Sequence, residues 1–328
     1  MNKLYPLKFD PIFKERIWGG EKLPRLFNKQ HSLQQLPVGE TWLLSALEGD
    51  ISVVSNGFLA GNSIQELIEI YMSDLVGEKC YEKFGYEFPL LIKLIDAADD
   101  LSIQVHPNNE LASNRHHAWG KSELWHFLDC EAESTVVAGF NKPTTRLDFD
   151  DSLRNGMLKN MLRYLKVKKG DSLYIPAGLI HTIGKGIFLA EIQQTSDITY
   201  RVYDWDRKDS SGKVRELHID LALDAIDYNA SQEIISGKEH MPNEPNLIIE
   251  SPFFTVKKIH LTQEQEQSEF NNENFLVYLC LDGRFEVLYA DDQKVDIKKG
   301  ELVLIPADLN GHILKPENET SLLEISLT

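Results

Sequence analysis

The stretch KVKKGDSLYIPAGLIHTI (166–183) decides the fold, because a second stretch, DIKKGELVLIPADLNGHIL (296–314), repeats its pattern. Both stretches begin with a basic turn and a glycine, continue through five residues typical of a strand, and reach Pro-Ala. A single repeat at this distance indicates two related β modules rather than a solenoid, in which units follow one another about every 20–50 residues.

Short apolar runs bounded by Gly, Pro, Asp or Asn occupy much of the remaining chain, as is typical of β-strands. The clearest runs span residues 89–97, 101–107, 171–178, 187–197, 274–283, 284–290 and 301–307. Their spacing favours a sandwich or barrel over repeated βαβ units. The expected fold is therefore mainly β, with two β-barrel modules.

Amphipathic segments predict helices that are added to the first module. They span about residues 63–86, 108–118, 150–165 and 216–228. The polar stretch 236–246 is a plausible boundary between the modules. We therefore expect a catalytic domain over residues 1–240 and a second domain over residues 241–328.

Composition excludes several classes of protein. With 34 basic and 51 acidic residues, the net charge is −17, and no basic stripe of the kind that binds nucleic acid is present. The three cysteines form no CxxC pair, which is typical of a reducing cytoplasm. Because no apolar run approaches about 20 residues and no signal peptide is recognisable, we expect no membrane association.

The first copy of the repeat, from Gly170 to His181, reads G-x5-P-x-G-x2-H and is similar to the second motif of the cupin superfamily. The resemblance implies that both modules are cupin, or jelly-roll-like, barrels. Upstream, Ser102, Gln104 and His106 share one strand face because side chains alternate along a strand. Polar groups on an inward face cost about 1–3 kcal/mol each unless they are paired, and a metal would pair them.

Glu123 opens the next strand and can add a carboxylate to this set. The predicted ligands are therefore Gln104, His106, Glu123 and His181. This mixture of nitrogen and oxygen ligands suits one zinc ion per chain, although manganese, iron or cobalt accept the same ligands.

Other residues compete for a place in the site. His126 is a possible substitute ligand, whereas His116 and His117 are expected on a solvated helix. Lys93 lies in an apolar strand, and we interpret it as a snorkelling side chain or a partner of Asp96, outside the site.

Three strings of residues resemble type I mannose-6-phosphate isomerases, in their short bacterial form without a large helical insertion. They are LLIKLIDAADDLSIQVHPNNE (90–110), GKSELWHF (120–127) and YIPAGLIHTIGKGIFLAEIQQTSDITYRVYDWDR (174–207). The motifs WGG (18–20) and GETW (39–42) match as well, so the resemblance runs over about residues 5–225. It implies a zinc enzyme that interconverts mannose 6-phosphate and fructose 6-phosphate.

The resemblance also implies an active-site Arg201, with Lys121, Glu191 and Ser102 lining the substrate pocket. Moving a carbonyl from C1 to C2 requires a base and a cation that stabilises the enediolate. We expect Arg201 to supply the charge and Glu191 to act as the base, with Lys121 or a metal-bound water as rivals.

Structural roles are alternatives for each of these residues. Arg201 could pair with Asp197 or Asp204, Lys121 could be a turn cation, and Glu191 could only hold a hydrogen bond. At the level of function, the alternatives are an iron-dependent cupin oxygenase and a non-catalytic sugar-binding cupin.

The second module departs from the ligand pattern. Asp308 stands where the first copy has Gly178, and His312 arrives one residue late. We expect this module to be a metal-free cupin, in a protein whose partner is a hexose phosphate and which forms a monomer or small homo-oligomer.

Overall fold

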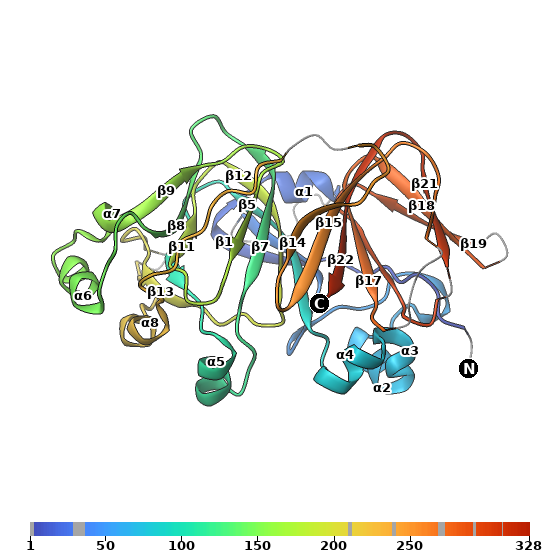
Figure 1. Cartoon of the computed structure of the whole chain (residues 1–328), viewed down its shortest axis with the longest axis horizontal. Coiled ribbons are helices and arrows are strands. Elements are labelled where there is room, and N and C mark those ends of the chain that lie inside the picture. Colours follow the sequence, from blue (N-terminus) through green and yellow to red (C-terminus); the bar gives the residue numbers. More distant parts are fainter. Residues whose placement is uncertain are drawn as a thin grey trace. The chain divides into compact units, whose positions relative to one another are not determined.

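The computed structural model describes residues 3–28, 37–208, 212–237, 241–267, 273–290, 293–309 and 311–328. The chain divides into two compact units. Unit 1 comprises Met1–Ile12, Trp42–Leu91 and Lys238–Thr328, and unit 2 comprises Phe13–Thr41 and Ile92–Gly237. The predicted boundary stretch 236–246 contains residues 238–240, which lie outside the described residues. Strands predominate in each unit (Figure 1).

Unit 2 carries two sheets that share a core. The order of the first sheet is β1 (Ile12–Gly20), β2 (Val38–Leu44), β5 (Leu90–Ala97), β12 (Ile187–Gln194), β7 (Glu123–Cys130) and β10 (Ser172–Ile175). The order of the second sheet is β13 (Tyr200–Tyr203), β6 (Ile103–Val105), β11 (His181–Ile183), β8 (Thr135–Phe140) and β9 (Leu162–Lys166). One buried cluster joins Trp125 and Phe127 of the first sheet to Val136 and Ile183 of the second.

Unit 1 repeats this arrangement. Its larger sheet has the order β14 (Asn246–Glu250), β15 (Phe254–Leu261), β22 (Thr320–Leu327), β17 (Leu276–Asp282) and β20 (Leu302–Ile305). The order of its smaller sheet is β16 (Gln265–Gln267), β21 (His312–Pro316), β18 (Arg284–Tyr289) and β19 (Gln293–Lys298), and β3 (Ala46–Leu47) pairs with β4 (Asp50–Ile51). Tyr278 and Val303 of the larger sheet share a core with Phe285 and Leu314 of the smaller one. The prediction of two cupin-like β modules is confirmed.

Short helices flank the sheets. Unit 2 has α1 (Lys22–Leu26), α5 (Asn109–His116), α6 (Arg146–Arg154), α7 (Leu158–Met161) and α8 (Ile219–Ala225). Unit 1 has the 3-10 helix η1 (Gly57–Leu59), α2 (Ile64–Tyr71), α3 (Ser73–Val76) and α4 (Glu78–Phe84). In the described parts of the chain, none of the helices has the length and apolar character needed to cross a membrane.

Two expectations about the helices need correction. The helical segment 63–86 belongs to unit 1 with the C-terminal strands, not to the first module. Two carbonyl groups of this segment accept hydrogen bonds from the C-terminal part of the chain, Val76 from Phe275 N–H and Leu75 from Ala307 N–H. In addition, the helix expected at 150–165 begins at Arg146, and its last residues form β9 because they pair with β8.

Candidate metal centre

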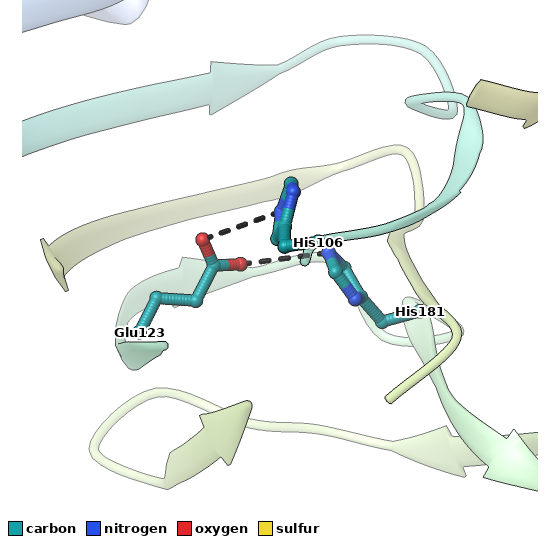
Figure 2. A group of neighbouring side chains, drawn as sticks. All are labelled: His106, Glu123 and His181. Carbon is teal, nitrogen blue, oxygen red and sulfur yellow. Dashed lines mark ion pairs between the residues drawn. The ribbon is translucent and has the colours of Figure 1, made fainter. Parts of the chain in front are cut away.

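Three side chains from different parts of the chain converge in unit 2. His106 follows β6, Glu123 begins β7 and His181 begins β11. All three are buried, and their possible ligand atoms lie within 4.8 Å of one another. Figure 2 shows that the two carboxylate oxygens of Glu123 face different histidines. Oε2 lies 3.6 Å from His106 Nε2, and Oε1 lies 3.5 Å from His181 Nε2.

Each histidine is held with Nε2 toward the centre. His106 Nδ1 lies 2.9 Å from the carbonyl oxygen of Ile198, and His181 Nδ1 lies 2.8 Å from that of Leu179. Because a carbonyl only accepts, each Nδ1 carries the proton and each Nε2 presents a lone pair. Burial lowers the pKa of His106 well below its usual range and the pKa of His181 to about 4. Both rings are therefore neutral at pH 7, as metal ligands must be.

The two Nε2 atoms and Glu123 form a set of acceptors that suits a cation. Glu123 Oε1 is buried and has no hydrogen-bond partner in the described part of the chain. The Lys121 ammonium faces the set, since it forms an ion pair with Glu123 Oε2 and lies 3.2 Å from His106 Nε2. Burial and the nearby Glu191 raise the pKa of Glu123 to about 7, which means that its ionised form is disfavoured. A bound divalent ion would favour the ionised form again. Two imidazoles and a carboxylate fit such an ion.

Strand register places two more predicted site residues near the centre, Gln104 beside His181 and Arg201 beside Gln104. Gln104 on β6 pairs with His181 on β11 and with Arg201 on β13. Residues paired directly across antiparallel strands point to one face, with Cβ atoms about 4.5–5.5 Å apart. Gln104 Nε2 lies 3.4 Å from His181 Nε2, and half a turn of the amide exchanges this nitrogen for the oxygen. Ser102 is buried next to it, with Oγ 3.4 Å from Gln104 Oε1.

A second carboxylate, Glu191 on β12, belongs to a buried charge network. Its Oε1 lies 3.0 Å from Lys93 Nζ and 3.9 Å from Lys121 Nζ, and its Oε2 accepts a 3.0 Å hydrogen bond from Trp125 Nε1. Burial opposes its ionisation, but Lys121 and Lys93 outweigh burial and lower the pKa of Glu191 to about 2. The network therefore contains a carboxylate that stays charged and holds two ammonium groups.

Lys93 also belongs to this network, which differs from the role expected from its sequence. The sequence predicts a snorkelling side chain or a partner of Asp96, but Lys93 is buried, and Asp96 accepts a 2.7 Å hydrogen bond from the Lys22 N–H. The available signal was its position: along β5 it alternates in step with the core residues Ile95 and Ala97. A lysine on an inward face requires a carboxylate partner.

The other histidines near the motif lie elsewhere. His126 Nδ1 is 2.8 Å from Ser172 Oγ, and strand alternation turns His126 to the face of β7 opposite Glu123. His116 Nε2 is 2.7 Å from the Tyr200 hydroxyl, and His117 ends α5 with a left-handed backbone. None of them joins the group of possible metal ligands.

Replacing Lys93 by methionine is expected to lower the free energy of unfolding by about 3 kcal/mol, because Glu191 would lose the closer of its two buried ammonium partners. Urea unfolding of the metal-free protein measures the change. The matched control is Lys22→Met, which removes an exposed ion pair with Asp129 and should cost no more than about 1 kcal/mol. If both variants lost the same free energy of unfolding, the buried Lys93–Glu191 pair would stabilise the protein no more than the exposed pair does.

The fold and the site together define a class of protein, a two-module cupin with a histidine–carboxylate centre. Two family models match the chain. The catalytic domain of type I phosphomannose isomerase matches residues 6–125, and the cupin domain of mannose-6-phosphate isomerase matches residues 243–319.

Whole-chain comparisons agree with the family models. The chain is 36% identical over 307 residues to mannose-6-phosphate isomerase ManA of Bacillus subtilis (strain 168), covering 93% of this chain and 94% of that protein. It is 31% identical over 306 residues to the mannose-6-phosphate isomerase of Streptococcus mutans, covering 92% of each. The crystal structure of the Bacillus subtilis mannose 6-phosphate isomerase superimposes with a TM-score of 0.83 at 30% identity, over 98% of this chain and 99% of that one. The chain therefore belongs to the type I mannose-6-phosphate isomerase family, which confirms the resemblance seen in its sequence.

Proposed function

We propose that this chain interconverts mannose 6-phosphate and fructose 6-phosphate, with one zinc ion held by Gln104, His106, Glu123 and His181. The observation that carries the proposal is the buried set of inward-facing acceptors at His106, Glu123 and His181, in a chain of this family. Family membership favours this function over a cupin oxygenase or a non-catalytic sugar-binding cupin.

The charged residues of the site are suited to a reaction that passes through a negatively charged intermediate. The isomerisation removes a proton beside a carbonyl and passes through an enediolate. When bound, a divalent ion can orient and polarise the oxygens on the two reacting carbons. Lys93 and Lys121 balance Glu123 and Glu191, so a divalent ion makes the cluster positive overall. A positive, water-poor site stabilises the developing negative charge.

Arg201 is proposed to take up charge on the substrate. Its Nη1 donates a 2.9 Å hydrogen bond to the Glu216 carbonyl, whereas its Nε is buried without a hydrogen-bond partner among the described residues. Asp204, an alternative partner considered from the sequence, is engaged by Arg207 and Arg215. These contacts leave the Arg201 guanidinium able to bind an anion, and its fork suits a carboxylate-like or phosphate oxygen pair.

Lys121 is proposed to transfer a proton to a substrate oxygen, and Glu191 is proposed to orient it. Their charged atoms lie 3.9 Å apart, and Lys121 is the member nearer to the ligands. Burial lowers the pKa of Lys121, but Glu123 and Glu191 raise it overall, so Lys121 is protonated and can donate to a substrate oxygen. The low pKa of Glu191 suits a group that orients this lysine. Ser102, buried beside Gln104, is proposed to contact the substrate.

We further propose a cytoplasmic enzyme that acts as a monomer or small homo-oligomer, in which residues 241–328 form a cupin domain without metal. The proposal of a metal-free domain is supported by Leu276, which pairs with Ile305 as Glu123 pairs with Ile175, so that an apolar side chain stands where unit 2 has a carboxylate.

Removal of the metal is expected to abolish turnover. A coupled assay follows fructose 6-phosphate formed from mannose 6-phosphate by the purified protein, before and after a chelator. We expect loss of activity on chelation and recovery with one equivalent of zinc per chain. Full metal occupancy without turnover of mannose 6-phosphate would contradict the proposed function.

A further inference from the structure

The second module repeats the strand order of the first. The sheets β14-β15-β22-β17-β20 and β16-β21-β18-β19 correspond to β2-β5-β12-β7-β10 and β6-β11-β8-β9. The register corresponds as well, since His312 on β21 pairs with Gln267 on β16 as His181 on β11 pairs with Gln104 on β6. The glutamine–histidine row of the metal centre is therefore present twice.

The charged and aromatic neighbours of this row are repeated too. Tyr278 packs edge-on against His312 with ring centroids 5.5 Å apart, and Glu324 lies opposite Tyr278 on β22. Lys257 Nζ lies 3.0 Å from Glu324 Oε1. The counterparts in unit 2, with the same 5.5 Å and 3.0 Å separations and the same strand pairing, are Trp125, His181, Glu191 and Lys93.

The repeat lacks the residue that makes the first copy a metal site. Leu276 pairs with Ile305 as Glu123 pairs with Ile175, so an apolar side chain replaces the ligand carboxylate. Among the described residues of unit 1, no group of His, Cys, Asp and Glu converges as a metal site does. The second module therefore keeps the surrounding polar residues, Gln267, His312, Tyr278, Glu324 and Lys257, which we call the polar framework. It lacks the carboxylate that Glu123 supplies in unit 2.

A pocket of about 680 Å³ opens at this framework, within the range of about 300–1,000 Å³ that is typical of small-molecule sites. Lys257, Gln267, Leu276 and Glu324 all line it. Glu324 is only 7% exposed, so its carboxylate is a buried group at the base of the pocket and not a surface group. Among the described residues, four glutamates and two lysines line this pocket; they are Glu250, Glu266, Glu273, Glu324, Lys79 and Lys257.

This balance of charge selects the kind of ligand. The two lysines are paired, Lys79 with Glu273 and Lys257 with Glu324, so the other charged side chains of the described lining are the carboxylates of Glu250 and Glu266. An excess of carboxylates repels a phosphorylated sugar. The hydroxyl groups of a sugar both donate and accept hydrogen bonds. The amide of Gln267 and the Lys257–Glu324 pair likewise offer both donors and acceptors, so they can bind hydroxyl groups.

We infer that the pocket bounded by Gln267, Leu276 and the Lys257–Glu324 pair is a second binding site, which takes an unphosphorylated hexose. The class of ligand rests on the proposed function, because the same framework in unit 2 is proposed to surround a sugar phosphate. The site itself rests on the repeated register and the pocket, and it binds without catalysing isomerisation.

The test uses the whole metal-loaded protein with labelled leucine methyl groups, so that Leu276 reports directly on the pocket. Titration with D-mannose is expected to shift the Leu276 resonances saturably, with a Kd on the order of 1–10 mM. Mannose 6-phosphate should bind at this position at least about tenfold more weakly. Gln267→Ala should weaken the binding of mannose about tenfold while isomerase activity is unchanged.

Glu123→Gln separates this inference from the proposed function, since the variant alters unit 2 alone and should leave the Leu276 shift intact. Loss of the shift in Glu123→Gln would place mannose at the metal centre and overturn the second site. The second site would also be overturned if the Leu276 resonances did not shift during the titration, or if Gln267→Ala responded to mannose as the parent protein does. A shift caused by the dication putrescine but not by mannose would overturn it too, because the site would then bind cations rather than a sugar.

Discussion

Glu123→Gln is expected to lower kcat/KM for mannose 6-phosphate by at least about 10⁴-fold and to remove the metal. The substitution keeps the size of the side chain but deletes the charge that faces both His106 Nε2 and His181 Nε2. Two neutral imidazoles in a buried site cannot hold a divalent ion firmly without that carboxylate. Elemental analysis of the purified variant and the coupled assay give the two readouts.

Glu133→Gln is the matched control for this substitution. Glu133 is an exposed residue whose ion pair with Lys166 lies on the surface, so its loss should leave metal content and kcat/KM within about twofold of the parent protein. A Glu123→Gln protein that retained one metal per chain and a tenth of the parent activity would show that Glu123 is not a ligand.

Arg201→Ala is expected to lower kcat by about 10³-fold while the metal remains bound. Arg201 lies next to Gln104 in the strand pairing, and its side-chain hydrogen bond goes to the Glu216 carbonyl rather than to one of the proposed ligands His106, Glu123 and His181. By the proposed role, its removal takes away positive charge that stabilises the enediolate, and it leaves the proposed metal ligands in place. Single-turnover measurements with metal analysis distinguish these effects.

Arg201→Lys sharpens the test, because it restores the charge without the planar fork and should recover only part of the lost rate. The control is Arg154→Ala, which breaks an exposed ion pair with Asp150 and should change kcat by less than about twofold. Loss of metal from Arg201→Ala would instead assign this arginine a structural role.

Features that depend on neighbouring residues could be predicted from the sequence. The spacing from Gly170 to His181 predicts one ligand of the proposed metal centre, and alternation along residues 102–106 predicts that Gln104 and His106 share one face. In the structure, the strand register brings Gln104 beside His181. Alternation defines the face of a strand, and together with the recognisable motif it was sufficient to predict that His106, Glu123 and His181 lie close together.

Features that depend on which strands become neighbours could not be predicted in this way. Lys93 and Glu191 are 98 residues apart, and their ion pair requires β5 and β12 to be adjacent in one sheet. The pairing of Lys257 with Glu324 in the second module could not be predicted for the same reason. There the sequence shows only the repeat of residues 166–183 in residues 296–314. The prediction that the helical segment 63–86 belongs to the first module is wrong for the same reason, since Phe275 and Ala307, which donate hydrogen bonds to Val76 and Leu75, lie far along the chain.

The most direct test of the central claim is anomalous diffraction from crystals of the active protein, measured on both sides of the zinc absorption edge. We predict one strong anomalous peak per chain, within bonding distance of His106 Nε2, His181 Nε2 and a Glu123 carboxylate oxygen. Peak height should fall when the crystals are soaked in chelator. A fully active protein whose anomalous peak lay elsewhere, or that gave none at any metal edge, would contradict the proposed metal centre.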